Sequence, residues 1–220
     1  MKAPWPAFID NQGMAFVETD GVYRSPLLQQ FPWLDHGFGG RNAPHWPPKH
    51  HAAVVQVHGA TVVTATEAGP QGEGDGLVTG TSALYVTVRT ADCLPLLMVD
   101  VRQRRVAAVH AGWRGTVAGI PQAAIGAMES DPADIWVAIG PGIGPCCFEV
   151  GDEVAREFGS SGRCYIDLFA YNYKKLLEFG VPPAQIAAVA PCTQCAPGEF
   201  HSFRRDQAQA GRMHAAIALI

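Results

Sequence analysis

Residues 84–115 read LYVTVRTADCLPLLMVDVRQRRVAAVHAGWRG, and this stretch predicts a strand, a bend, a second strand, a polar turn, a third strand and the start of a helix. The apolar runs 94–99 and 106–109 flank a charged segment, which is the pattern of a β-hairpin. If the turn is centred near Arg102 and Gln103, residues whose numbers sum to about 205 face each other. We therefore expect His110 to lie opposite Pro95.

This hairpin brings a thiol and an imidazole to one point. Cys93 lies two residues from Pro95, so it projects from the same face as His110. Such diagonal neighbours lie roughly 7 to 8 Å apart by backbone, a gap that both side chains can close around a metal ion. His58, at the end of the apolar-rich segment 54–57 and just before Gly59, is the best third ligand. Three protein ligands with an open fourth position are typical of a catalytic zinc site.

A simpler interpretation competes with the metal site. A single buried Cys is usually an inert small hydrophobe, and a His at a strand end usually satisfies a local hydrogen bond. On spacing alone, that interpretation is favoured over a site formed by His58, Cys93 and His110.

Several blocks of the chain resemble one family when they are taken together. These blocks are QVHG at 56–59, TADCLP at 90–95, VHAGWRG at 109–115, GPGIGPCCFEV at 140–150, FHSFRRD at 200–206 and GRM at 211–213. In this order they resemble the bacterial laccase-domain family. Its members have been called polyphenol oxidases and are now described as purine nucleoside phosphorylases with adenosine deaminase activity. The resemblance spans roughly residues 36–220 and favours the three-ligand metal site.

The resemblance and the element pattern together define the expected fold. Alternating strands and helices predict a mixed-sheet α/β domain, and the resemblance implies an α/β/β/α layered sandwich with the site at one end of a sheet. We expect one domain over residues 1–220, because no linker or low-complexity run divides the chain.

Individual elements follow from local patterns. Helical spacing over 112–128 is interrupted by Pro121, which predicts a kink or two short helices. Asp167 is expected to cap a helix that runs to Phe179 and ends at Gly180. A strand broken at Gly59 is expected at 53–63, and further strands are expected at 135–139, 186–190 and 213–220. Edge strands are expected within 1–34, and a turn at 71–76.

Further residues are expected near the metal. Asp75 begins a DGLVT segment that resembles the family's Asp-Ala-Leu-Val-Thr, which makes Asp75 a candidate catalytic group. The alternative is that the Asp75 side chain only stabilises the backbone of its own glycine turn. Arg114, in the first turn of a helix after His110, can hold an anion such as phosphate, or pair with an acid. Arg41 and Gln56 are the other candidate substrate contacts. Segment 43–51 is shorter than in the family, which weakens the prediction of the substrate.

The remaining cysteines suggest no second site. Cys192 and Cys195 have the Cys-x-x-Cys spacing of redox and zinc sites, but the chain has no second Cys pair at comparable spacing, so neither role is favoured. Cys146 and Cys147 are expected to be packed thiols. With no secretory signal, we expect reduced thiols and a cytoplasmic protein, and with no apolar run of 18 residues we expect no membrane-spanning helix. We also expect a monomer.

The composition of the chain limits the classes of partner that we expect it to bind. A net charge of −4 offers no basic field for nucleic acid or an acidic membrane, and 48% hydrophobic residues suit a domain with a large core. The expected partners are small molecules, namely purine nucleosides and phosphate.

The resemblance implies a zinc-dependent purine nucleoside phosphorylase that also deaminates adenosine. Zinc lowers the pKa of a bound water toward about 7, which suits attack at C6 of adenosine. Copper can occupy the same ligands, but multicopper catalysis needs about eight further imidazoles, and the chain has eight His in all. Two alternatives stay open: a metal-independent cysteine hydrolase that uses Cys93 and His110, and an accessory role in cell-wall precursor editing.

Overall fold

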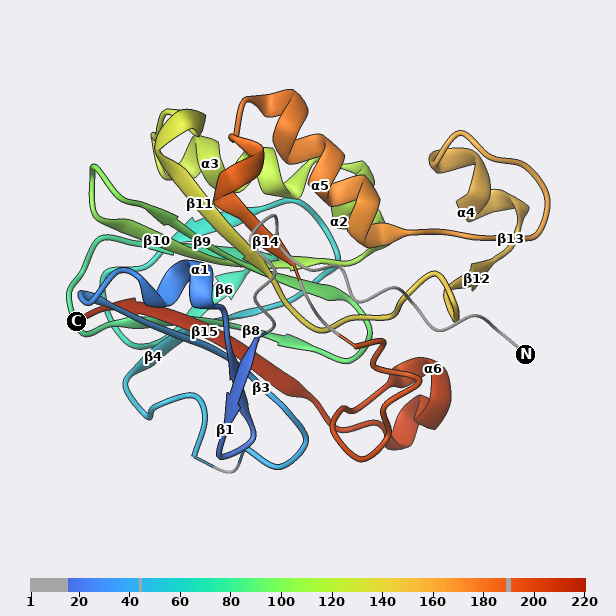
Figure 1. The fold of residues 1–220 in the computed structure, drawn as a ribbon, viewed down its shortest axis with the longest axis horizontal. Helices are drawn as coiled ribbons and strands as arrows, with labels where there is room; N and C mark the ends of the chain where they lie inside the picture. Colours follow the sequence, from blue (N-terminus) through green and yellow to red (C-terminus); the bar gives the residue numbers. More distant parts are fainter. Residues whose placement is uncertain (1–15, 44, 189–190) are drawn as a thin grey trace.

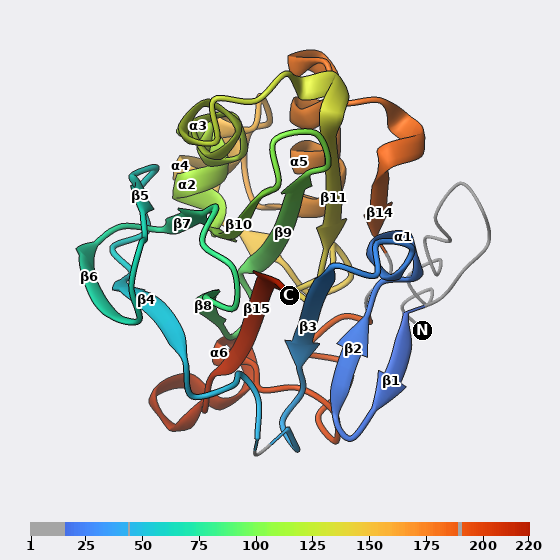
Figure 2. The same cartoon turned by 90° about the vertical axis from the view of Figure 1, so that its left-hand side faces the viewer.

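Two mixed β-sheets face each other in the computed structural model, which describes residues 16–43, 45–188 and 191–220. One sheet has seven strands in the order β1-β2-β3-β15-β8-β4-β6, and the other has six in the order β14-β11-β9-β10-β7-β5. Helices α2, α3 and α5 lie over the outer face of the six-stranded sheet (Figures 1 and 2). The predicted mixed-sheet α/β class, with layered sheets flanked by helices, is confirmed.

The helices and strands have the following bounds. The strands are β1 Val17–Thr19, β2 Val22–Arg24, β3 Leu34–Gly39, β4 His51–Val55, β5 Val62–Thr64, β6 Gly69–Glu73, β7 Gly76–Thr79, β8 Tyr85–Thr90, β9 Leu94–Asp100, β10 Arg105–Ala111, β11 Ile135–Ile139, β12 Glu149–Val150, β13 Cys164–Tyr165, β14 Ile186–Ala188 and β15 Met213–Leu219. The α-helices are α1 Pro26–Gln29, α2 Trp113–Val117, α3 Ile120–Ala127, α4 Asp152–Glu157, α5 Leu168–Phe179 and α6 Phe203–Asp206.

The β9–β10 hairpin has the register that its sequence predicts. His110 pairs with Pro95 and Arg105 pairs with Asp100. The Asp100 carboxylate closes the turn, because its Oδ1 accepts hydrogen bonds from the amides of Arg102 and Gln103, both at 2.8 Å. The hairpin is therefore fixed by a polar tip and two apolar arms, as the sequence indicates.

Both faces of this hairpin are buried, which explains why its strands are apolar without alternation. Leu97 and Val99 belong to the core between the two sheets. Leu96 and Met98, on the opposite face, belong to the core between the six-stranded sheet and the helices. All four side chains are 0% exposed, and burial of each contributes about 1.5–3 kcal/mol.

The segment after β10 forms two short helices, as Pro121 predicts, and the chain turns between them at Gly119. Gly119 has φ of +80°, which glycine adopts without strain, and Pro121 lies in the first turn of α3, where it needs no amide partner. The predicted cap of α5 is also confirmed: Asp167 accepts a 2.8 Å hydrogen bond from the Ala170 amide, and Gly180, at φ of +107°, ends the helix.

Two sequence predictions need correction. The strand expected at 53–63 is two strands in different sheets, β4 and β5. The turn expected at 71–76 is partly β6, which pairs with β4 in parallel through backbone hydrogen bonds that its glycine-rich sequence does not signal. The predicted strand 213–220 is present as β15, which lies between β3 and β8 inside its sheet. The predicted strand 186–190 is present as β14, and residues 189–190 lie outside the described part of the chain.

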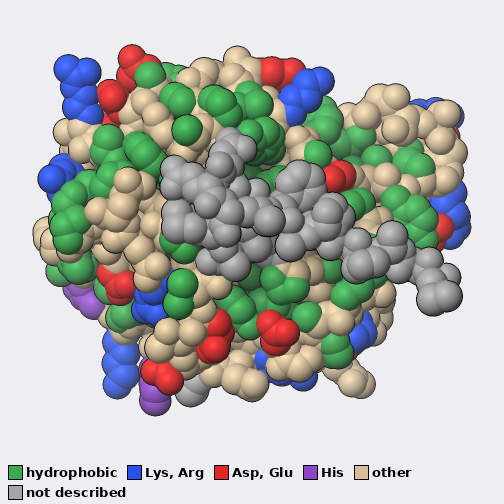
Figure 3. All heavy atoms as spheres, viewed as in Figure 1, with side chains coloured by type: hydrophobic (Ala, Val, Ile, Leu, Met, Phe, Trp, Pro, Cys, Tyr) green, Lys and Arg blue, Asp and Glu red, His purple; other side chains and the backbone are tan. Residues whose placement is uncertain are grey.

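The visible surface carries charges of both signs. In Figure 3, Lys and Arg side chains lie scattered among Asp and Glu side chains over the coloured residues, without one continuous basic patch. Among the described residues, no helix combines the length and the apolar character needed to cross a membrane.

Candidate metal centre

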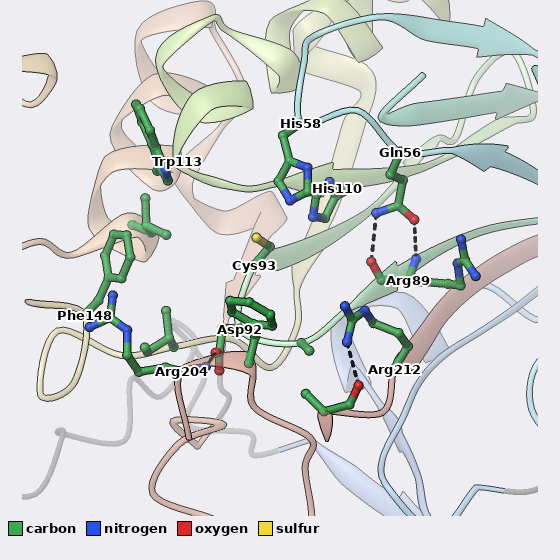
Figure 4. Close-up of a pocket in the computed structure, with 15 residues that line it drawn as sticks. Gln56, His58, Arg89, Asp92, Cys93, His110, Trp113, Phe148, Arg204 and Arg212 are labelled. Atoms are coloured by element: carbon green, nitrogen blue, oxygen red, sulfur yellow. Dashed lines mark hydrogen bonds between the residues drawn. The ribbon is translucent and has the colours of Figure 1, made fainter. Parts of the chain in front are cut away.

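The hairpin places Cys93 and His110 at one end of the layer between the sheets. Both residues have the strand parity of Leu97, which faces the opposite sheet. His110 is 3% exposed, and Cys93 lies at the bend just before β9. The side chains of His58, Cys93 and His110 point toward one another in Figure 4, and their ligand atoms all lie within 4.8 Å of one another.

His58 reaches this point from the loop that crosses between the two sheets. Its φ of +61° is in the left-handed region, which a non-glycine residue keeps only when its surroundings hold it there. The buried Asp75 carboxylate does so: it accepts hydrogen bonds from the His58 amide at 2.9 Å and from the Gly59 amide at 2.6 Å. The His58 and His110 rings then meet edge to face, with centroids 4.9 Å apart.

The same carboxylate fixes the second imidazole. Asp75 Oδ1 lies 2.8 Å from Nδ1 of His110, and the Asp75 side chain is 0% exposed. A proton on Nδ1 then points at Asp75, so Nε2 is left with a lone pair. A carboxylate behind a ligating imidazole is the usual arrangement at protein metal sites, because it sets the tautomer and raises the basicity of the ring.

Electrostatics favour a thiolate and an imidazolium when no cation is bound. Burial opposes ionisation of the Cys93 thiol, but hydrogen bonds to His110 and His58 outweigh it and lower the pKa of Cys93 to about 7. Burial also disfavours protonated His110, yet Asp75 and Cys93 raise its pKa to about 9. For Asp75, burial is outweighed by His110 and the amides of Gly59 and His58, so the pKa of Asp75 falls below its ordinary value. The Cys93 thiolate, the His110 imidazolium and the Asp75 carboxylate then carry one net negative charge, which a bound cation would neutralise as it replaces the proton on Nε2 of His110.

The donor set suits a zinc ion with three protein ligands. Two imidazoles and one thiolate match the ligands and spacing of a catalytic zinc site, and they also match the ligands of copper. The backbone leaves room for these donors: a Cβ on Gly112 would lie 3.0 Å from the Cys93 sulfur and 3.5 Å from Cδ2 of His58. Glycine at this position lets the start of α2 pass close behind the ligands.

A cavity of about 660 Å³ opens beside the three ligands. Its volume lies in the range of ligand-binding pockets. Aromatic, apolar and cationic side chains share the wall (Figure 4). The lining residues are Gln56, His58, Arg89, Ala91, Asp92, Cys93, His110, Trp113, Ile143, Phe148, Leu168, Phe203, Arg204, Ala210 and Arg212.

Of the three residues predicted to contact substrate, only Gln56 lines the cavity. Gln56 lines the cavity, but its amide also pairs with the backbone of Arg89 through two 2.8 Å hydrogen bonds. Arg114 is not among the lining residues, and its guanidinium lies 4.5 Å from the centroid of the Trp113 ring. Arg41 lines a neighbouring hollow and lies 3.5 Å from the Asp206 carboxylate.

Three arginines that the sequence did not indicate line the cavity: Arg89, Arg204 and Arg212. Arg204 is held by the backbone, because its Nη1 donates to the carbonyls of Cys147 and Glu149 at 3.1 and 3.0 Å. Arg212 donates to the carbonyl of Ala210 at 2.8 Å. Arg204 and Arg212 belong to the FHSFRRD and GRM blocks, which were the available signal for them.

The fold and the three converging ligands define a protein with a laccase-like domain, and a family profile gives the same result. The profile described as "Multi-copper polyphenol oxidoreductase laccase" matches residues 41–220. The chain belongs to this family.

Two relatives that are named for an activity are similar to much of this chain. The chain is 39% identical over 181 residues to a Deinococcus radiodurans protein named "Purine nucleoside phosphorylase", across 76% of this chain and 70% of the relative. It is 38% identical over 160 residues to "Adenosine deaminase RL5" from an unknown prokaryotic organism, across 65% of this chain and 61% of the relative.

Solved structures share the fold. The crystal structure of the Bacillus licheniformis hypothetical protein YfiH superposes with a TM-score of 0.84 at 25% identity, over 92% of this chain and 98% of that one. YlmD from Geobacillus stearothermophilus superposes with a TM-score of 0.81 at 28% identity, over 93% and 98%.

Proposed function

We propose that this protein is a zinc-dependent purine nucleoside phosphorylase that also deaminates adenosine. One observation carries the proposal: His58, Cys93 and His110 converge at the wall of a cavity large enough for a nucleoside. The names of the two relatives support this substrate class.

The chain's own residues divide the work. His58, Cys93 and His110 would hold the zinc ion, and Asp75 would keep His110 in the tautomer that presents Nε2. When bound, zinc supplies Lewis acidity and lowers the pKa of water toward about 7. In deamination, water adds at C6 of adenosine and ammonia leaves, which gives inosine.

The cavity offers separate surfaces for the base and for phosphate. The aromatic rings of Phe148 and Trp113 present faces against which a purine can stack. Arg89 and Arg212 present positive charge for a phosphate anion. In phosphorolysis, a phosphate oxygen bonds to the anomeric carbon, the N-glycosidic bond breaks, and the base leaves with a proton as ribose-1-phosphate forms.

Product analysis tests this proposal. Zinc-loaded protein incubated with adenosine and phosphate should form inosine, free base and ribose-1-phosphate, and Cys93→Ala should form none of them. Cys164→Ala is the matched control, because Cys164 lies outside the metal ligands and the cavity wall, and it should keep wild-type rates. If zinc-loaded wild-type protein forms neither inosine nor free base, the proposal is wrong.

A cysteine hydrolase without metal is the second candidate. It is favoured by the chain of Asp75, His110 and Cys93, in which a carboxylate supports an imidazole beside a thiol whose pKa is lowered to about 7. Hydrolysis that survives metal chelation but stops after thiol alkylation would support this candidate. Activity lost on chelation and restored by zinc excludes it.

A further inference from the structure

Four cysteine sulfur atoms lie close together at a second place, which includes none of the residues His58, Cys93 and His110. The ligand atoms of Cys146, Cys147, Cys192 and Cys195 all lie within 4.8 Å of one another. Cys195 Sγ lies 3.4 Å from Cys147 Sγ and 3.8 Å from Cys146 Sγ. Four thiolates at about 2.3 Å from a tetrahedral zinc ion lie about 3.8 Å from one another. The two distances at Cys195 are close to this value, and the 4.8 Å limit for all four atoms is compatible with a four-thiolate metal site.

The two pairs of cysteines come from loops at one edge of the six-stranded sheet. The strands β11 and β14 are parallel neighbours, so the loops that follow them leave the sheet on the same side. A bridge between Gly142 and Cys192, with a 3.0 Å hydrogen bond from the Thr193 amide to the Gly142 carbonyl, aligns the two loops. The fold thus positions the cysteines through backbone contacts that do not depend on the sulfur atoms.

A backbone amide already donates a hydrogen bond to one of the four sulfur atoms. The Gly144 amide donates a 3.2 Å hydrogen bond to Sγ of Cys192, a side chain that is only 5% exposed. Amides that donate to a buried sulfur favour its ligating, thiolate form. This contact also crosses between the two loops, as a shared metal ion would.

Positive charge lies next to both loops. Arg204 Nη1 donates to the Cys147 carbonyl at 3.1 Å, and Arg205 Nη1 donates to the carbonyls of Thr193 and Gln194 at 3.0 and 3.3 Å. A zinc ion with four thiolates carries a net charge of about −2, and the Arg204 guanidinium would offset part of it. Arg205 contributes less, because it is also paired with the Asp206 carboxylate through two 2.8 Å hydrogen bonds.

We propose that Cys146, Cys147, Cys192 and Cys195 bind a structural zinc ion that ties the loop after β11 to the loop after β14. Binding releases four thiol protons to solvent and involves no redox change. All four positions around the zinc are filled by protein, so the site holds structure and has no position for substrate. It shares no ligand with the site formed by His58, Cys93 and His110.

The zinc ion would also hold one wall of the cavity. Ile143 and Phe148, on either side of Cys146 and Cys147, both line that wall. On the other loop, the Thr193 hydroxyl donates a 2.6 Å hydrogen bond to the carboxylate of Asp92, the residue before Cys93. Loss of the zinc should therefore loosen the cavity as well as the two loops.

Zinc counting separates the two sites. In the double variant His58→Ala, Cys93→Ala, which lacks the first site, we expect one zinc per chain. Adding Cys192→Ser or Cys195→Ser to this background should reduce zinc to none, whereas adding Cys164→Ser should leave it at one. Circular dichroism identifies any variant that fails to fold. If the folded double variant purifies without zinc and takes up none, the proposal is overturned, whatever the state of the first site.

Zinc X-ray absorption on the same double variant tests the ligand set without a change in the cluster. The proposal expects four sulfur neighbours at about 2.3 Å. Nitrogen or oxygen ligands, an iron-sulfur cluster in place of zinc, or a disulfide between Cys147 and Cys195 in freshly purified protein would each overturn it.

Discussion

Replacing Asp75 with Asn tests how much of the metal centre depends on one carboxylate. Asp75 accepts hydrogen bonds from the amides of His58 and Gly59 and from the His110 ring. Asn offers one oxygen and one NH₂ group. Placed at the Oδ2 position, the NH₂ group faces the Gly59 amide donor. Placed at the Oδ1 position, it faces the His58 amide donor and also Nδ1 of His110, unless His110 changes tautomer and accepts through Nδ1. That tautomer puts the proton on Nε2, where it blocks metal binding.

The size of the effect follows from these contacts. Loss of a hydrogen bond behind a ligating His typically weakens metal affinity by about 10- to 100-fold, which is about 1.4–2.7 kcal/mol. An amide donor left unpaired in the buried loop costs about 1–3 kcal/mol of folding free energy. We therefore expect Asp75→Asn to bind zinc at least about tenfold more weakly and to unfold more easily in urea.

Chelator competition measures the zinc affinity, and urea unfolding measures the stability. Asp100→Asn is the matched control: Asp100 is also 0% exposed and accepts two backbone amides, but it contacts no candidate ligand. This control should keep its zinc affinity at the His58 site, because both amides donate to Oδ1 and an Asn can accept them through its own Oδ1. An Asp75→Asn protein that binds zinc as tightly as the Asp100→Asn protein would refute the reasoning.

Three further changes have defined outcomes. Burial lowers the pKa of His36 to about 4, so protonation of His36 opposes folding below pH 6.5. Between pH 7 and pH 5, the free energy of unfolding measured in urea should therefore fall by about 2 kcal/mol more in wild type than in His36→Gln. Gly112→Ala places a Cβ 3.0 Å from the Cys93 sulfur and should weaken zinc binding in chelator competition, whereas Gly126→Ala, with open space around its Cβ, should keep it and stabilise α3 by up to about 1 kcal/mol. Leu97→Ala removes a side chain that is 0% exposed between the sheets and should lower the free energy of unfolding in urea by about 2–5 kcal/mol. Equal stability of Leu97→Ala and wild type would contradict this expectation. Equal pH dependence of the stability of His36→Gln and wild type would contradict the expectation for His36.

Those parts of the fold that are formed by residues close together in the chain could be predicted from the sequence. The hairpin register follows from a charged tip between two apolar arms, and it places Cys93 and His110 on one face. The ends of α5 follow from the capping preferences of Asp167 and Gly180. In each case the interacting residues are close in the chain, so their spacing carries the geometry.

The parts that depend on contacts between distant segments could not be predicted from spacing. His58 reaches the site because the Asp75 carboxylate holds a loop that passes from one sheet to the other. The cysteine pairs at 146–147 and 192–195 meet because β11 and β14 are parallel neighbours, a pairing that adjacent residues do not encode. Cavity arginines such as Arg89 have no local signal, since their role depends on which segments surround the cavity.

Anomalous diffraction at the zinc absorption edge, from crystals grown with zinc, tests the central claim most directly. The account predicts a peak about 2.3 Å from Sγ of Cys93 and about 2.0–2.1 Å from one ring nitrogen each of His58 and His110. If zinc-soaked crystals show no peak there, or show the three side chains turned away from one another, the metal centre proposed for this protein does not exist.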